Sequence, residues 1–184
     1  YFKNLVVKAF KNKNGKLLNV ASGPGRDLKE LYEENPSLIL KTTCVEMDEN
    51  AIMYAKKLTH DYNEDIEYIQ KNIFRFKTEQ KYDLIWSAGL FDYFDDKAFV
   101  LLLKRFKTWL APGGEIVVGN FNEDHNPSRA YMEAFGEWYL NHRTEKQLIE
   151  LGIAAGFKPE QLSVGREEEN VNLFLHVRGG NCIS

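Results

Sequence analysis

Short apolar runs alternate with amphipathic stretches along most of the chain. Apolar runs bounded by turn residues predict buried strands, and apolar residues at helical spacing predict helices. The predicted strands are residues 16–21, 38–45, 66–70, 82–87, 115–121, 157–164 and 171–177. The predicted helices are residues 2–11, 24–34, 49–60, 128–140 and 144–155, with a long helix that starts at Asp95 and carries Phe99, Leu102, Leu103, Phe106 and Leu110 inward.

The order of these elements predicts an α/β fold. Strands separated by helices of this length form βαβ units, in which the strands are parallel. The last two predicted strands have only a loop between them, so they should pair antiparallel. We therefore expect a three-layer, doubly wound, mostly parallel sheet with an antiparallel carboxyl-terminal strand. A length of 184 residues fits a single domain spanning 1–184.

Composition excludes several classes of protein. Apolar residues make up 43% and charged residues 28%, and the net charge is −3. Basic and acidic residues are interspersed, so there is no basic stripe for nucleic acid. No apolar run approaches the roughly 20 residues of a membrane span. The chain begins with Tyr1 rather than Met, which leaves open that residues precede it in the natural protein.

The two cysteines, Cys44 and Cys182, are far apart and lack metal-ligand spacing. This usage indicates a reducing compartment, and we expect a cytoplasmic protein without a metal site. Cys44 lies in an apolar run and is expected to be buried. The acidic pair Asp95 and Asp96, with Asp92 nearby, is better interpreted as a helix start than as a metal site.

The first predicted strand runs into a turn that contains Gly23 and Gly25. Glycines let the backbone approach a ligand closely, although a tight turn without a ligand is the alternative. Glu46 stands 21 positions after Gly25, near the spacing at which such folds place a carboxylate on a ribose diol, and an exposed glutamate at a strand end is the alternative. A dinucleotide-binding fold requires a third glycine at the position where this chain has Leu28. Arg26 is the lone basic residue nearby that could pair with a pyrophosphate. A nucleoside without phosphates therefore fits better than NAD.

Four stretches resemble the motifs of one enzyme family. They are LLNVASGPGRDL, CVEMDENAIMYAKKL, YDLIWSAGLFDYF and WLAPGGEIVVGNF, and they occur in order between residues 16 and 121. Together they resemble the class I, Rossmann-like methyltransferases that use S-adenosyl-L-methionine. The resemblance implies a seven-stranded sheet with a reversed last strand, this cofactor, and a small-molecule acceptor.

The resemblance also implies which residues hold the cofactor. Gly23 to Gly25 would lie against its methionine part, Glu46 would hold the ribose, and Met47 would lie on the adenine. Asn72 would read the adenine amino group. The other implied positions are Ile73 beside the adenine, Ser87, Ala88 and Gly89 around the reacting methyl, and Asn19 and Ala21, where the family more often has an acidic residue and a glycine.

The segment after residue 121 is similar to a bacterial group that makes the methyl ester of a 3-hydroxy fatty acid signal. Polar residues here would line an acceptor pocket, and an ordinary cap or surface contact is the alternative for each. Arg129 or Arg143 would pair with a carboxylate acceptor, because a guanidinium matches two oxygens. A hydroxyl or amine acceptor would instead need a base to remove its proton, and the candidates for this base are His125 and His142. Asn122 and Asn126 complete this set.

Aromatic residues cluster around the same segment. Phe91 and Tyr93 follow the fourth strand and should face the site, with Tyr93 a further catalytic candidate. With Phe94, Tyr131, Phe135, Trp138 and Tyr139 they could form an apolar acceptor slot, although most members of this set are expected in the core. Two other functions stay open: a cofactor-binding regulatory module without catalysis, and a nicotinamide-dependent oxidoreductase. The sequence predicts neither the acceptor nor the oligomeric state.

Overall fold

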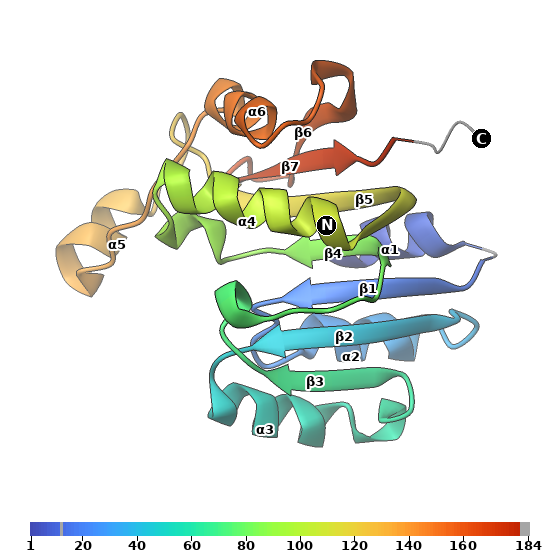
Figure 1. Ribbon diagram of the computed structural model, residues 1–184. Coiled ribbons are helices and arrows are strands. Elements are labelled where there is room, and N and C mark those ends of the chain that lie inside the picture. The colour runs from blue at the N-terminus through green and yellow to red at the C-terminus, as the bar shows by residue number, and fades with distance from the viewer. Residues whose placement is uncertain (12, 181–184) are drawn as a thin grey trace.

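The computed structural model describes residues 1–11 and 13–180, and its centre is a seven-stranded sheet (Figure 1). The strand order is β3-β2-β1-β4-β5-β7-β6, and β7 runs antiparallel to both of its neighbours. The strands are β1 (Gly15–Val20), β2 (Leu40–Glu46), β3 (Ile66–Gln70), β4 (Tyr82–Ser87), β5 (Leu110–Phe121), β6 (Leu162–Arg166) and β7 (Asn172–Arg178). The predicted α/β sheet with a reversed last strand is confirmed.

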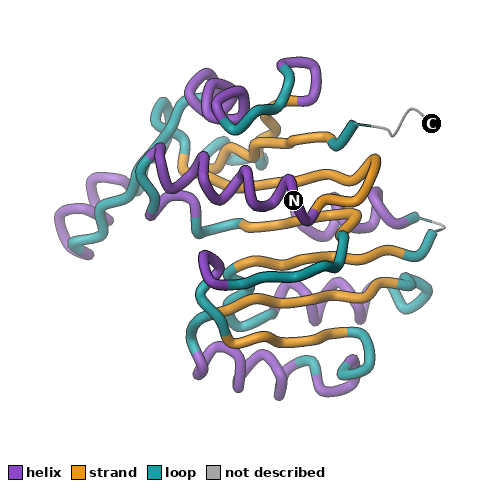
Figure 2. The backbone as a smooth tube through the Cα atoms, in the orientation of Figure 1, coloured by secondary structure: helices purple, strands orange, loops and turns teal. Residues whose placement is uncertain are grey.

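Helices cover both faces of this sheet, so the fold has three layers (Figures 1 and 2). The helices are α1 (Phe2–Phe10), α2 (Arg26–Glu34), α3 (Glu49–Leu58), α4 (Asp96–Trp109), α5 (Arg129–Gly136) and α6 (Glu145–Ala154). Residues of α1 and α2 share one apolar cluster with the sheet, and residues of α4 and α6 share the other. Among the described helices, none is long and apolar enough to cross a membrane.

The apolar runs of the sequence correspond to strands that are buried on both faces. In β1, Leu17 packs in the cluster beneath α1 and α2, whereas Leu18 and Val20 pack in the cluster beneath α4 and α6. Because both faces of such a strand are covered by helices, its sequence is a continuous apolar stretch. Cys44 of β2 is a buried free thiol, as expected, and Cys182 lies outside the described residues.

Helix α4 starts where the sequence predicts and ends one residue earlier. Oδ1 of Asp95 accepts the backbone N–H of Ala98 at 2.8 Å, which confirms the helix start. The expectation that Leu110 faces inward on this helix is wrong. The helix ends at Trp109, which is buried, and Leu110 already pairs with Tyr82 as the first residue of β5.

Two other predicted boundaries are wrong. The helix expected over 128–140 is only α5, because the chain enters the left-handed region at Glu137 (φ 46°) after Gly136. The strand expected over 157–164 begins at Leu162. A 3-10 turn, Pro159–Gln161, precedes it, since proline has no N–H for a ladder.

Strand β1 lies between β2 and β4, and the chain winds outward from it in both directions. This is the switch point at which open α/β sheets bind ligands, outside the carboxyl ends of their strands. The loops that follow β1, β2, β3 and β4 gather at this edge (Figure 2). Strand β5 also approaches closely there, because a Cβ built on Gly119 would lie 2.3 Å from the carbonyl oxygen of Ala88.

Candidate active site

The turn after β1 presents bare backbone to the edge of the sheet. Ala21, Gly23 and Gly25 all adopt positive φ, at 53°, 56° and 68°. A Cβ built on Gly23 would meet no heavy atom within 4 Å, so this residue borders open space. The turn therefore leaves room for a ligand to approach the main chain closely.

Glu46, at the end of β2, ties this turn to the neighbouring strand. Its Oε2 accepts the N–H of Gly23 at 2.9 Å, and its Oε1 accepts the N–H groups of Met47 and Asp48 at 2.7 and 3.0 Å. A carboxylate has about four acceptor positions, so backbone groups occupy most of them. Glu46 is held in a fixed orientation, with acceptor capacity for about one further hydroxyl while these three bonds persist.

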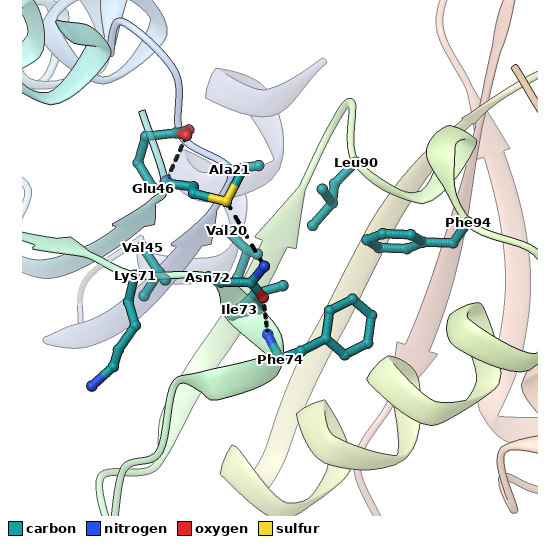
Figure 3. Close-up of a pocket in the computed structure, with 11 residues that line it drawn as sticks. Val20, Ala21, Val45, Glu46, Lys71, Asn72, Ile73, Phe74, Leu90 and Phe94 are labelled. Carbon is teal, nitrogen blue, oxygen red and sulfur yellow. Dashed lines mark hydrogen bonds between the residues drawn. The ribbon is translucent and has the colours of Figure 1, made fainter. Parts of the chain in front are cut away.

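A pocket opens between the ends of β1, β2 and β3 and the loop after β4 (Figure 3). We call it the first pocket, and its lining residues are Val20, Ala21, Val45, Glu46, Met47, Lys71, Asn72, Ile73, Phe74, Leu90 and Phe94. Figure 3 shows Leu90 and Phe94 across the pocket from Val45 and Lys71. Five of the expected cofactor-binding residues therefore come together here: Ala21, Glu46, Met47, Asn72 and Ile73.

Asn72 is fixed at the mouth of the first pocket. Its Oδ1 accepts the N–H of Phe74 at 2.9 Å, capping a 3-10 turn, and its Nδ2 lies 3.8 Å from Sδ of Met47. Met47 itself is largely exposed. A polar amide and a flexible thioether thus border the same space, with Ile73 buried below them.

Three buried polar atoms near the ends of β1 and β4 have no hydrogen-bond partner among the described residues. They are Nδ2 of Asn19, Oγ of Ser22 and Oγ of Ser87. Buried polar groups are nearly always paired, so orphans at one edge of a sheet indicate a missing polar partner. An open glycine turn, a fixed carboxylate, an apolar slot and these orphans fit a nucleoside that carries an amino-acid tail.

A second pocket lies on the other side of the loop after β4. Its lining residues are Ala88, Gly89, Asp92, Tyr93, Phe121, Trp138, Leu140, Asn172 and Phe174. Leu90 lines the first pocket, whereas Ala88 and Gly89 line the second. The short segment 88–90 therefore separates the two spaces, and two reactants bound in them would meet across it.

Asp92 is the carboxylate in the wall of the second pocket, and it is only 3% exposed. Its Oδ1 accepts the N–H of Phe121 at 2.6 Å. Burial raises the pKa of Asp92 to about 6, against the opposing effects of that N–H group and of the Arg143 charge. A carboxylate with such a pKa is suited to proton transfer near neutrality.

Arg143 is buried away from both pockets, with 3% exposure. Its guanidinium donates to the carbonyl oxygens of Phe91 and Phe94 at 3.2 and 2.6 Å. It also donates to Oδ1 of Asn120 at 2.7 Å and to Oδ1 of Asp96 at 3.0 Å. Its donors are therefore used to hold the turn that carries Asp92.

The other expected acceptor residues are also placed outside the second pocket, with Tyr93 the exception. Nε2 of His142 lies 2.9 Å from Nδ2 of Asn126, and the ring packs on Phe121. Arg129 pairs with Glu123 and Glu133, at 2.9 Å each. His125 is exposed and Asn122 is buried, where its Nδ2 donates to the carbonyl of Asn170.

The expectation that most aromatics of this region lie in the core is wrong. Tyr131, Phe135 and Tyr139 are exposed, Phe135 by 78%, and no residue of α5 is buried. Tyr131 and Phe135 lie on α5, which stands off the sheet, so the sheet does not cover them (Figure 1). Phe91 was expected to face the site but is fully buried in the core. Trp138 is 44% exposed, and its Nε1 donates to Oη of Tyr93 at 3.0 Å.

Sequence reasoning missed most of the second pocket. Asp92 was considered only as part of a metal site, and no group of three His, Cys, Asp or Glu side chains suited to a metal occurs in the described chain. The wall residues Phe121, Leu140, Asn172 and Phe174 were not expected. Phe121 and Asn172 lie opposite each other at the end of β5 and the start of β7, so correct pairing of those strands was the signal available.

A profile of the methyltransferase domain family matches residues 11–166, well over half of the chain. The chain belongs to this family. S-adenosyl-L-methionine is the cofactor of such methyltransferase domains, and this membership disfavours the nicotinamide alternative. No curated protein matches the methyltransferase domain significantly in sequence.

Solved structures share the fold of this methyltransferase domain. One, described as a possible exported protein from Bordetella parapertussis, is 20% identical with a TM-score of 0.79, over 97% of this chain and 66% of that one. Human N-acetylserotonin methyltransferase in complex with S-adenosylmethionine is 20% identical with a TM-score of 0.72, over 97% and 52%. The N-methyltransferase NodS from Bradyrhizobium japonicum, in complex with S-adenosylhomocysteine, is 17% identical with a TM-score of 0.67, over 97% and 85%.

The methyltransferase domain is shorter than several of the proteins it resembles. It spans 66% of the Bordetella protein and 52% of the human enzyme. At identities of 20% or less, these likenesses establish the fold of the domain.

Proposed function

We propose that this chain transfers a methyl group from S-adenosyl-L-methionine to a small molecule bound in the second pocket, acting as one catalytic domain. The observation that carries this proposal is the shared wall of the two pockets, segment 88–90. The cofactor would supply an electrophilic methyl group, and the protein would supply alignment. Holding two reactants at near-attack distance lowers a barrier by several kcal/mol.

The first pocket would hold the nucleoside end of the cofactor. Glu46 would accept a hydrogen bond from a ribose hydroxyl, and Met47 would lie on the adenine. Asn72, beside Ile73, would accept a hydrogen bond from the adenine amino group. The turn from Ala21 to Gly25 would lie against the methionine part. The remaining contacts would come from the buried Asn19 and Ser87, whose unpaired atoms need a partner, and from Ala88 and Gly89 near the methyl.

The acceptor is proposed to be an oxygen of an apolar, fatty-acid-like compound. Phe121, Trp138, Leu140 and Phe174 form apolar walls of the second pocket. Because Asp92 is the charged group in the wall, a neutral hydroxyl fits better than a carboxylate, which it would repel.

Calorimetric titration with S-adenosylmethionine, S-adenosylhomocysteine and NAD tests the cofactor. We expect saturable binding of S-adenosylmethionine and S-adenosylhomocysteine and no binding of NAD. Absence of binding by both sulfur nucleosides would contradict the proposal. Turnover of a panel of hydroxy acids, fatty acids, alcohols and phenols then tests catalysis. Cofactor binding without any turnover would favour the regulatory module. We also propose a reducing compartment such as the cytoplasm, on the basis of the free thiol of Cys44.

A further inference from the structure

We propose that Asp92 accepts the proton of a hydroxyl acceptor during methyl transfer, which makes this acidic side chain the base of the reaction. The inference rests on the proposed function and names the acceptor class of the second pocket: a hydroxyl that must lose its proton. No role as a base follows from the sequence, where His125 and His142 are the candidates.

The geometry assigns the role by elimination among the described residues. Of the side chains that line the second pocket, Asp92 alone is a carboxylate, and no histidine lines it. His142 is engaged with Asn126, and His125 is exposed outside the pocket. Asp92 lines the same pocket as Ala88 and Gly89, the two residues of segment 88–90 that border the second pocket.

One oxygen of Asp92 is fixed and the other is available. Oδ1 is held by the Phe121 N–H, and the carbonyl of Asp92 accepts the N–H and Nδ2 of Asn141 at 2.8 and 3.1 Å. Oδ2 accepts no hydrogen bond from another residue of the described chain, and it is not a buried orphan. The carboxylate is therefore oriented by its surroundings, with a free oxygen for a ligand.

The charged and titratable groups around Asp92 leave it basic. Arg143 is the cation that acts on it, but the Arg143 donors bond Phe91, Phe94, Asn120 and Asp96 instead of the Asp92 carboxylate. Three other polar groups face Asp92. They are the N–H of Phe121 on β5, the neutral side chain of Asn172 on β7, and Tyr93 on the same turn as Asp92. A pKa of about 6 keeps Asp92 mostly ionised at neutral pH and still able to take a proton.

The step balances with these groups alone. The acceptor oxygen forms a bond to the methyl carbon while the carbon–sulfur bond breaks, and that electron pair stays on sulfur. The hydroxyl proton passes to Oδ2 of Asp92, so the product is a neutral methyl ether. Asp92 then releases the proton to solvent, which restores the carboxylate.

A binding experiment tests the assignment without turnover. The probe is 4-nitrophenol, whose ionised form absorbs visible light, added to protein saturated with S-adenosylhomocysteine at neutral pH. The Asp92 carboxylate should keep the bound probe protonated, so its ionised fraction falls on binding. Asp92→Asn retains an oxygen for the Phe121 N–H but loses the charge, and the bound probe should ionise at least tenfold more readily in that variant. Equal ionisation in both proteins, or no binding of the probe, would overturn the proposal.

Turnover provides the second measurement. With a hydroxyl acceptor from the panel, Asp92→Asn should lower kcat by about 10²- to 10⁴-fold and remove the decline of the rate below about pH 6. The exposed Asp61→Asn is the matched control and should leave the rate unchanged. Asp92→Ser serves in both experiments where Asp92→Asn does not fold.

The failures of the two proposals are distinguishable. Normal binding of S-adenosylhomocysteine with an unchanged rate and pH profile in Asp92→Asn overturns the role of Asp92 and leaves the proposed function standing. Absence of S-adenosylhomocysteine binding by the unmodified protein overturns both.

Discussion

Arg143 donates through Nη1 to Oδ1 of Asn120 at 2.7 Å, and both side chains are buried. This bond joins the segment before α6 to strand β5. The amide of Asn120 also donates to the carbonyl of Asn141 at 2.8 Å, so the two residues form one polar network. The network fixes the turn after β4 against β5 and thereby orients the wall of the second pocket.

Replacement of Arg143 should be strongly destabilising. Arg143→Met leaves Oδ1 of Asn120 and the carbonyl oxygen of Phe94 without their donor, and each unsatisfied buried group costs about 1–3 kcal/mol. We expect the free energy of unfolding to fall by about 3 kcal/mol in urea denaturation. Arg129→Met is the matched control, because its half-exposed ion pairs with Glu123 and Glu133 contribute at most about 1 kcal/mol. Equal losses in the two variants would contradict this structural role.

Glu46 should set the affinity for the cofactor. Glu46→Gln removes one acceptor oxygen and the charge, so the turn at Gly23 and a ribose hydroxyl compete for what remains. A hydrogen bond to a charged group contributes about 1.5–3 kcal/mol, which corresponds to roughly 10- to 100-fold in Kd for S-adenosylhomocysteine. Calorimetry measures this. Glu49→Gln, in the exposed first turn of α3, should bind normally, and an unaltered Kd for Glu46→Gln would remove the ribose role.

Asp92 should make stability depend on pH. Its pKa is raised from 3.8 to about 6 in the folded protein, so the folded state holds this proton more tightly than the unfolded chain. The contribution of Asp92 to the free energy of unfolding therefore falls as pH rises through that window, by on the order of 2–3 kcal/mol.

Asp92→Asn removes this dependence. Relative to the unmodified protein, the variant should gain about 2–3 kcal/mol of stability between about pH 4 and about pH 7, measured by urea denaturation across the range. The exposed Asp61→Asn should show no such trend. A constant difference between Asp92→Asn and the unmodified protein at all pH values would contradict the raised pKa.

Trp138 should report on the second pocket by fluorescence. Trp86 and Trp109 are buried, whereas Trp138 is exposed and lines the pocket. A ligand that covers its indole, such as a long-chain alcohol from the turnover panel, should shift the emission to shorter wavelength. Trp138→Phe should abolish the shift and Trp109→Phe should retain it. Persistence of the shift in Trp138→Phe would place the ligand elsewhere.

Ala21 should be a site of backbone strain. Its φ of 53° lies in the left-handed region, which costs a residue with a Cβ about 1–2 kcal/mol. Ala21→Gly should raise the free energy of unfolding by about 0.5–1 kcal/mol in thermal or urea denaturation. Gly23→Ala, at φ 56°, should have the opposite sign. Destabilisation by Ala21→Gly would show that the φ angle carries no net strain.

The sequence predicts the sheet and the first pocket well because both depend on local patterns. Apolar strands alternate with helices, and the ends of β1, β2 and β3 place Ala21, Glu46 and Asn72 at one edge by topology alone. Neighbouring parallel strands bring their carboxyl ends together, so spacing along the chain is enough to assemble these residues.

The second pocket could not be predicted in this way, because its walls come from segments far apart in the chain. Arg143 and His142 have the chemistry of acceptor-binding residues, but contacts with β5 and with Asn126 bury them. Asp92 looks like an ordinary residue before a helix until the Phe121 N–H and the surrounding burial are known. The exposed face of α5 likewise depends on how that helix docks, which its sequence pattern does not specify.

The close approach of Gly119 to Ala88 bears on how such a protein changes its substrate over evolution. The junction of the two pockets is built from main chain, and a side chain at position 119 would displace it. The walls of the second pocket are instead side chains from separate segments, including Tyr93, Trp138 and Leu140. Substitutions in those walls can exchange one acceptor for another while the point of transfer stays where the backbone puts it. Selectivity for the acceptor thus depends on the side chains of the pocket walls, whereas the reaction geometry depends on the backbone at the junction of the two pockets.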